Sequence, residues 1–171
     1  MIIRIALMLV ACLLLTGFTS CQSPADTKAG ALADLDASFE RRVLVIEADD
    51  GVGHEFDVYL AVTDEQKRRG LMFVRELPDR SGMLFIYDDS NMQSMWMKNT
   101  YISLDLVFAR SDGTVSSIIR EAQPLSLQPL SSVEPVSLVL ELNAGTTRRY
   151  KIGRGSRLVW KPEAESQHRG N

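Results

Sequence analysis

The stretch from residue 41 to residue 62, RRVLVIEADDGVGHEFDVYLAV, decides the fold class of this chain. Val43–Ala48 is rich in β-branched residues, Asp49-Asp50-Gly51 is a turn signal, and apolar residues alternate again over His54–Val62. Two such runs joined by a glycine-containing turn predict a β-hairpin. The folded part of the chain is therefore expected to begin with antiparallel strands.

Short segments of similar character follow the hairpin. Residues 63–70 begin with an N-cap threonine, carry acidic residues first and basic residues last, and close on a glycine, which predicts a short helix. Short strands with hairpin turns and a single well-marked helix favour a mainly β fold, a single antiparallel β-sandwich or barrel with one or two short helices. The expected strands cover residues 83–87, 95–98, 104–109, 114–120, 136–142 and 156–160.

The composition fits one globular domain with a substantial core, because the chain has 171 residues, of which 45% are hydrophobic, and a net charge of −3. Its basic residues are not clustered, so nucleic-acid binding is not expected. Its two cysteines, Cys12 and Cys21, both precede the folded domain. This excludes cysteine nucleophiles, cysteine-rich zinc sites and iron–sulfur clusters in the domain, and we expect no cofactor.

The N-terminus predicts export. Arg4 precedes the apolar run Ile5–Leu15, which is too short for a permanent membrane helix and is typical of a secretory signal peptide. Residues 16–21, TGFTSC, resemble a bacterial lipobox, in which the cysteine is acylated and becomes the new N-terminus. Cleavage after Ala25 is the alternative. The protein is therefore expected in the periplasm, or lipid-anchored through Cys21 to a bacterial envelope membrane.

The domain organisation follows from these segments. We expect a lipoprotein-type signal peptide over residues 1–20, a flexible tether over 21–38, a mainly β domain over 39–161 and a polar tail over 162–171. A short helix around Leu32, Leu35 and Phe39 is an alternative for the end of the tether. The oligomeric state is left open.

Residues 92–100, MQSMWMKNT, combine soft thioether side chains with a polar trio. Thioether sulfur suits Cu(I), so Met92, Met95 and Met97 form a candidate metal site. In a strand, however, Met95 and Met97 share one face while Trp96 points to the other, and no histidine or cysteine is close in sequence. Core packing of the methionines is therefore favoured, and no metal site is predicted.

Polar residues that interrupt apolar strands are the other candidates. Lys98, Asn99 and Thr100 end one predicted strand, and Asp105 and Glu141 lie inside two others. A buried carboxylate needs a partner, for which Lys98, Asn99 and Arg75 are available. Three interpretations stay open: a structural ion-pair network, a ligand-binding patch, or an acid–base pair that hydrolyses an envelope polymer.

Several short motifs together resemble the domain of unknown function 192 family, small proteins of bacteria and archaea. The resemblance covers roughly residues 42–160 and implies a compact, jelly-roll-like β domain, but no activity. Met95 departs from the family's usual phenylalanine, and Ser103 replaces the usual proline before Leu104-Asp105. The matching pieces are Val62-Thr63, Gly70-Leu71-Met72, Gly82-Met83-Leu84-Phe85, Trp96-Met97-Lys98-Asn99-Thr100, Leu104-Asp105, Phe108 with Asp112-Gly113, and Leu140-Glu141-Leu142 with Ala144-Gly145.

These observations predict a non-catalytic envelope protein that binds a small molecule, a glycan or a protein partner. A hydrolase acting through Asp105 and Glu141 is one alternative, and Cu(I) binding through the three methionines is another. The candidate ligand-binding residues are Thr63, Lys98, Asn99, Thr100, Asp105 and Glu141.

Overall fold

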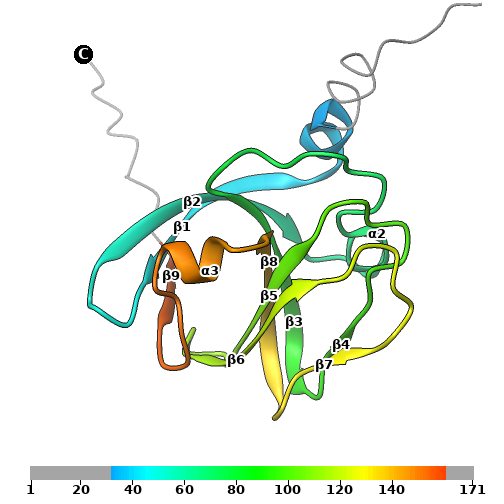
Figure 1. The fold of residues 1–171 in the computed structure, drawn as a ribbon. Helices are drawn as coiled ribbons and strands as arrows, with labels where there is room; N and C mark the ends of the chain where they lie inside the picture. Colours follow the sequence, from blue (N-terminus) through cyan, green and yellow to red (C-terminus); the bar gives the residue numbers. More distant parts are fainter. Residues whose placement is uncertain (1–31, 161–171) are drawn as a thin grey trace, which may run out of the picture.

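The computed structural model describes residues 32–160. The predicted signal peptide, Cys21, the alternative cleavage site and the tail over 162–171 lie outside the described residues. The elements are β1 (Glu40–Glu47), β2 (Gly53–Ala61), α2 (Asp64–Arg69), β3 (Ser81–Asn91), β4 (Ser94–Met95), β5 (Leu104–Ala109), β6 (Val115–Ala122), β7 (Leu130–Ser131), β8 (Val136–Asn143), α3 (Thr146–Arg149) and β9 (Arg157–Trp160), after a helix over residues 32–38 (Figure 1).

The predicted hairpin is confirmed as β1 and β2. Their register runs from Glu40 opposite Leu60 to Glu47 opposite Gly53, and Gly51 turns the chain with a φ of 77°. The predicted helix is confirmed as α2. Thr63 accepts a hydrogen bond from the Gln66 amide, and the Gln66 side chain accepts one from the Thr63 amide in return. This capping box satisfies two of the amide groups that a helix N-terminus leaves unpaired.

The main sheet has seven strands in the order β6-β5-β8-β3-β2-β1-β9 (Figure 1). The mainly β fold is confirmed, but the sheet is mixed, because β2 and β3 pair in parallel. An antiparallel pair can be joined by a short hairpin turn, whereas a parallel pair such as β2 and β3 needs a longer crossover connection. Residues 62–80 with α2 supply that crossover.

Both faces of the curled sheet carry a hydrophobic core. One core takes residues from all seven strands, among them Leu44, Phe56 and Leu140. The other lies on the opposite face, under the helix 32–38 and residues 71–77 and 95–97, and includes Phe85 and Phe108. Strands β5 and β8 are buried on both faces, which is why their sequences are apolar nearly throughout.

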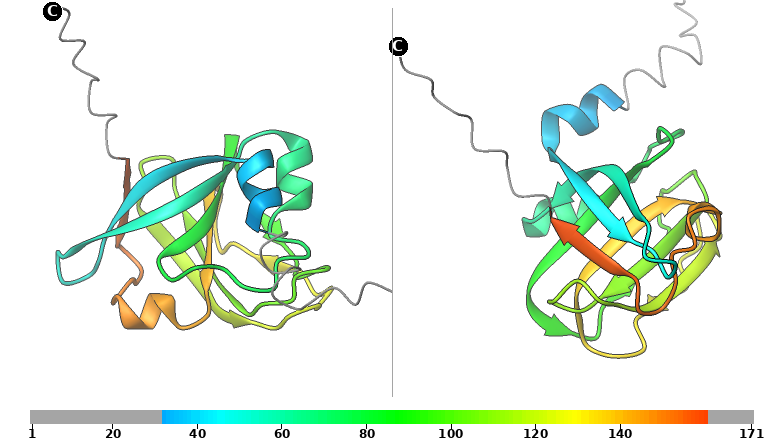
Figure 2. Two further views of the ribbon diagram at one scale, coloured as in Figure 1. Left: turned by 90° about the horizontal axis from the view of Figure 1, so that it is seen from above. Right: turned by 90° about the vertical axis from the view of Figure 1, so that its left-hand side faces the viewer.

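The two edges of the main sheet meet at one point. Thr114, just before β6, bridges Arg157 at the start of β9, and the Leu158 amide donates to the Gly113 carbonyl at 2.9 Å. Figure 2 shows β9 beside β1, on the opposite side of β1 from β2, where the sheet curls over. The result is a strongly curled, sandwich-like sheet.

The tether predicted over residues 21–38 includes residues that belong to the folded domain. Residues 32–38 form a helix in which Leu35 is fully buried, and Phe39 is buried in the same core. The helix is fixed to α2 by an ion pair between Asp34 and Arg69 and by a hydrogen bond from Gln66 Nε2 to the Ser38 carbonyl at 3.0 Å. Its apolar residues therefore belong to the folded domain.

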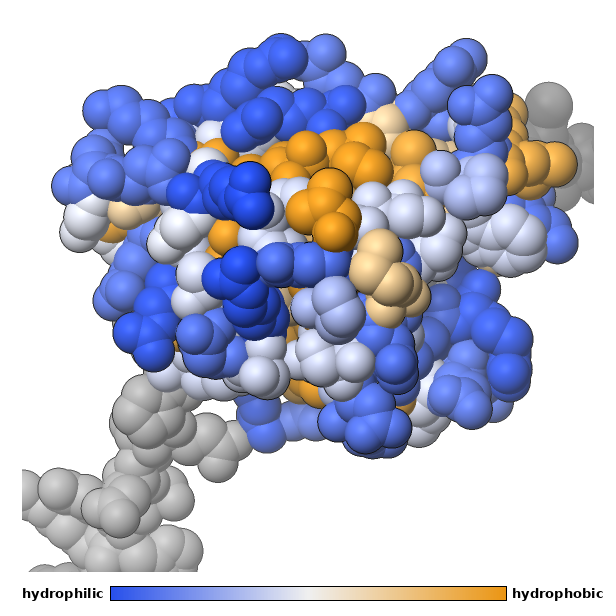
Figure 3. Space-filling view, turned by 90° about the horizontal axis from the view of Figure 1, so that it is seen from below, coloured by the Kyte–Doolittle hydropathy of each residue, from blue (hydrophilic) through white to orange (hydrophobic). Residues whose placement is uncertain are grey.

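The surface is mostly hydrophilic but includes apolar areas. Figure 3 shows an apolar band on the face seen from below, with hydrophilic side chains around it. Among the exposed apolar side chains, Leu125 and Leu127 lie between β6 and β7, and Val133 lies between β7 and β8. No helix within residues 32–160 has the length and apolar character needed to cross a bilayer.

Candidate functional site: a pocket over Glu141

An open pocket of about 350 Å³ lies between α2, β3 and the segment over residues 94–100. Its wall combines aromatic and thioether side chains with cationic ones, and a carboxyl group lies at its floor. The lining residues that matter most below are Lys67, Met72, Tyr87, Met95, Lys98 and Glu141.

Glu141 is placed at the floor by the sheet register. It lies in β8 between Met83 of β3 and Leu106 of β5, and both of these cross-strand neighbours are fully buried. The side chain of Glu141 is 4% exposed, and no group within residues 32–160 hydrogen-bonds its carboxyl. Burial alone raises the pKa of Glu141 to about 8. The carboxyl is therefore mainly protonated and uncharged at neutral pH.

Two lysines approach the pocket over aromatic rings. Lys67 Nζ lies 4.9 Å from the centre of the Tyr87 ring, and Lys98 Nζ lies 5.0 Å from that of Trp96. Burial, and next the charge of Glu141, raise the pKa of Tyr87 to about 12. The Tyr87 hydroxyl donates to the Met95 sulfur at 3.7 Å. The walls of the pocket thus have their own polar atoms largely satisfied, and the floor does not.

The segment after β4 turns instead of continuing as a strand. The strand predicted over 95–98 ends at Met95, because the Thr100 amide donates to the Met97 carbonyl at 3.1 Å and Asn99 adopts a φ of 56°. Met97 is nevertheless fully buried, and Trp96 is 50% exposed, as the predicted alternation required. The turn directs Lys98 and Thr100 to the pocket.

The hypothesis of an acid–base pair of Asp105 and Glu141 is wrong. Glu141 is the cross-strand partner of Leu106, so these two side chains share one face of the sheet. Asp105 precedes Leu106 in the same strand and therefore points to the opposite face. A hydrolase that uses these two carboxyl groups on one substrate is thereby excluded.

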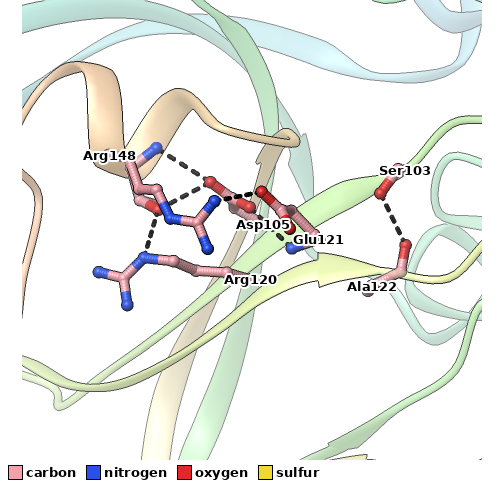
Figure 4. A network of polar contacts seen from close by, with 7 residues as sticks. Ser103, Asp105, Arg120, Glu121, Ala122 and Arg148 are labelled. Carbon is pink, nitrogen blue, oxygen red and sulfur yellow. Dashed lines mark hydrogen bonds and ion pairs between the residues drawn. The ribbon is translucent and has the colours of Figure 1, made fainter.

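Asp105 holds a structural network, drawn in Figure 4. Its Oδ1 accepts from the Glu121 amide at 3.0 Å, and its Oδ2 accepts from the Thr147 amide at 3.0 Å and the Thr147 hydroxyl at 2.7 Å. Arg120 donates to the same hydroxyl at 3.0 Å, and Arg148 forms an ion pair with Glu121. The expected partners Lys98, Asn99 and Arg75 do not bind Asp105, and the Arg75 guanidinium instead lies over the Tyr101 ring.

A β-bulge explains why a carboxylate is needed there. Leu104 pairs with Ala122 and Leu106 with Ile119, so two residues of β6 oppose Asp105 alone. The extra residue of a bulge is left out of the backbone ladder. Asp105 accepts the amide hydrogen of Glu121 that the bulge leaves unpaired, and connects this point to α3. The residue defines the fold on the face away from the pocket.

The remaining candidates divide between the two roles. Lys98, Thr100 and Glu141 line the pocket. Thr63 caps α2, and Asn99 supports the turn by accepting from the Phe73 amide at 2.8 Å through its carbonyl. Lys67, Met72 and Tyr87 were not predicted, because no local sequence pattern relates α2, the loop after it or β3 to residues 94–100.

The methionines of residues 92–97 do not form one Cu(I) site. Met92 is 57% exposed, Met97 is fully buried in the core, and only Met95 lines the pocket. The second thioether in the pocket wall is Met72, whose sulfur accepts from Asn99 Nδ2 at 3.8 Å. Within residues 32–160, no three histidine, cysteine, aspartate or glutamate side chains are placed to hold a metal ion.

A family model with the description "Uncharacterized ACR, COG1430" matches residues 45–160. The match covers nearly all of the main sheet, including β3 and β8 beside the pocket. The chain belongs to the DUF192 family. A putative transcription regulator from Sinorhizobium meliloti 1021 has a similar crystal structure, with 41% identity, a TM-score of 0.71, and coverage of 72% of this chain and 95% of that one.

A second similar crystal structure is that of a protein of unknown function from Novosphingobium aromaticivorans DSM 12444. It is 34% identical, with a TM-score of 0.69 and coverage of 72% of this chain and 88% of that one. No match was found among proteins of curated function. Family membership therefore fixes the fold and assigns no activity.

The structure accounts for the two departures from the DUF192 motif. Met95 packs in the core beside the pocket, where a larger aromatic ring is the family's usual filler. The Ser103 hydroxyl donates to the Ala122 carbonyl at 3.0 Å, so it ties the turn before Asp105 to β6 (Figure 4). This hydrogen bond constrains the turn at the position where the family usually has proline.

Proposed function

We propose that this DUF192 protein is an exported, non-catalytic binding module of the bacterial cell envelope, and that it binds a small molecule in the pocket over Glu141. The observation that carries this proposal is the unpartnered Glu141 carboxyl at the floor of an open cavity. This carboxyl is free to hydrogen-bond a ligand in the pocket, and one such hydrogen bond contributes about 0.5–1.5 kcal/mol.

The dimensions and chemistry of the pocket support a small ligand over a glycan or a protein. A cavity of about 350 Å³ falls within the range of small-molecule sites, which are mainly apolar with a few polar groups that orient the ligand. Here the apolar part is supplied by side chains such as Met72 and Phe85, and the orienting groups by Lys98, Thr100 and Glu141.

A thermal-shift screen tests the binding proposal. The panel holds organic acids, amines, amino acids, neutral sugars, cell-wall fragments and metal ions, Cu(I) included. At least one compound is expected to raise the melting temperature of the wild type and to have no effect on Glu141→Leu. The matched control is Glu47→Gln on the exposed face of β1, which should respond as the wild type does. No stabilising compound, or equal stabilisation of the Leu variant, rejects the proposed site.

Export is supported by the sequence of residues 1–21 alone. Fractionation of a bacterial expression host, followed by intact-mass measurement, tests it. An acylated mature chain in the membrane fraction, displaced to the soluble periplasm by Cys21→Ala, supports a lipid anchor. A periplasmic chain that begins at residue 26 supports cleavage after Ala25, and an unprocessed cytoplasmic chain rejects export.

A further inference from the structure

The rim of the pocket carries positive charge that no carboxylate of the described residues neutralises. Lys67, Arg68 and Lys98 line the pocket and form no ion pair within residues 32–160. Arg69, the next cation of α2, differs from these three residues, because it forms an ion pair with Asp34 that fixes the helix over residues 32–38 to α2. Asp64 is the only acidic residue besides Glu141 in the part of the wall that the structure describes.

The two lysines are positioned, because each ammonium group lies over a ring that lines the same pocket. Lys67 is over Tyr87 and Lys98 is over Trp96, at 4.9 and 5.0 Å from the ring centres. A cation over an aromatic face is attracted by the ring quadrupole. The chain as a whole has a net charge of −3, so this local excess of cations runs against the composition.

Part of the pocket wall is apolar. Leu71, Phe85 and Met95 contribute to it, and the sulfurs of Met72 and Met95 already accept hydrogen bonds. A ligand body that contacts this wall must itself be apolar or aromatic, because it finds few free polar partners there. At the floor, the uncharged Glu141 carboxyl can both donate and accept a hydrogen bond.

We infer that the pocket takes an amphipathic organic anion, whose acidic group lies among Lys67, Arg68 and Lys98 and whose apolar body extends over Phe85 and the methionines toward Glu141. The inference rests on the proposed function and names its ligand class. A carboxylate and a phosphate monoester share this chemistry, and the experiment separates them.

The charge of Glu141 couples this binding to pH. The charged and titratable groups that line the pocket with it are Asp64, Lys67, Arg68 and Arg69 from α2, Tyr87 from β3 and Lys98 from the turn after β4. Burial keeps the Glu141 carboxyl neutral until its pKa near 8. Above that pH a negative charge appears at the floor and repels an anionic ligand, so affinity falls as pH rises through about 8.

Matched probes test the ligand class on the full chain. 3-Phenylpropionate, 3-phenylpropanamide and 3-phenylpropylamine share one apolar body and differ in the charge of the head group, and phenyl phosphate tests the other anion. Dissociation constants come from amide chemical shifts in NMR titrations at pH 6.5. We expect one of the two anions to bind at least about tenfold more tightly than the amide and the amine, which corresponds to about 1.4 kcal/mol.

Variants locate the anion and the pH effect. Lys67→Met and Lys98→Met keep the length of the side chain and are each expected to weaken anion binding about three- to tenfold. Arg154→Met removes a cation from an exposed turn outside the pocket and is expected to leave the dissociation constant as it is. Between pH 6.5 and pH 9 the wild type should lose affinity for the anion, and Glu141→Gln should show no such loss.

The outcomes are distinct from those of the broader screen. Preferred binding of the amine or the amide, equal binding of all the probes, or binding of none overturns the anion inference, even where the screen finds another ligand in the pocket. Anion binding that resists both lysine substitutions also overturns it, because the anion then lies elsewhere. A pH dependence shared by the wild type and Glu141→Gln assigns the effect to another group and removes Glu141 from the inference.

Discussion

Replacing Glu141 with glutamine should change the pH dependence of stability more than any other single substitution in the pocket. In the folded chain burial raises the pKa of Glu141 from an ordinary 4.5 to about 8. Between these two values the folded state holds a proton that the unfolded state has released. Stability therefore falls as pH rises through this interval, and the loss is complete above pH 8.

The magnitude follows from the two pKa values. One pH unit corresponds to about 1.4 kcal/mol, so the whole interval is worth at most about 5 kcal/mol. Between pH 5 and pH 8 the Glu141 carboxyl of the wild type should lower the free energy of unfolding by about 3–4 kcal/mol. Glutamine is neutral throughout and resembles the protonated carboxyl in size. The variant should match the wild type near pH 4.5 and exceed its stability at pH 8.

Urea unfolding followed by far-ultraviolet circular dichroism measures this difference at pH 5, 6, 7 and 8. The exposed Glu47→Gln variant is the control, and its stability should follow that of the wild type at each pH. The quantity to compare is the difference in free energy of unfolding between Glu141→Gln and the wild type. A difference that is constant from pH 5 to pH 8 would refute the reasoning, because the folded carboxyl would then titrate as the unfolded one does.

Three further predictions concern the fold, two of them with a matched control variant. Asp105→Asn should lower the free energy of unfolding by about 3 kcal/mol, because the side-chain amide has one accepting oxygen and cannot accept from both Glu121 and Thr147. An unfolding midpoint in urea equal to that of the wild type would contradict the network. Thr63→Ala should cost about 1 kcal/mol of cap stability and Thr63→Ser much less, as measured by thermal melting; equal melting temperatures for the two variants would speak against the cap. Gly113→Ala should cost more than about 2 kcal/mol, because its Cβ would lie 2.2 Å from the Leu158 carbonyl oxygen at a φ of 84°. Gly155→Ala meets open space at a similar φ and carries only the backbone strain; comparable losses in the two variants would mean that the contact with β9 is unimportant.

The local features of the fold, the β1–β2 hairpin included, were predictable from the sequence, and the long-range strand pairings were not. Turn chemistry around Gly51 and the cap at Thr63 act over a few residues, so their sequence signals are complete. The parallel pairing of β2 with β3 depends on how the crossover through α2 packs, and a helix this short gave little indication of it. Residues 32–38 were assigned to a tether because they belong to a stretch rich in alanine, serine and aspartate, although Leu32, Leu35 and Phe39 pack in the core.

The candidate site was only half predictable for a related reason. Glu141 and Asp105 both stood out as acids inside apolar runs, and that signal is local. The face on which each lies depends on the register of β5 against β8, and the partner of each depends on α2, α3 and the bulge in β6. Lys67 looked like a residue that stabilises the end of a helix, and Tyr87 like the end of a strand. Only the tertiary structure places them beside Glu141.

The pairing of β1 with β9 has a consequence for the order in which the chain is made. β1 is synthesised first among the strands, and its second neighbour, residues 157–160, is synthesised last. Until that segment leaves the ribosome or a translocation channel, β1 has one row of unpaired amide and carbonyl groups, of the kind to which other chains add. The domain therefore cannot close its sheet while it is still being made. A chain cut before Arg157 keeps that edge open permanently and should associate with its own copies.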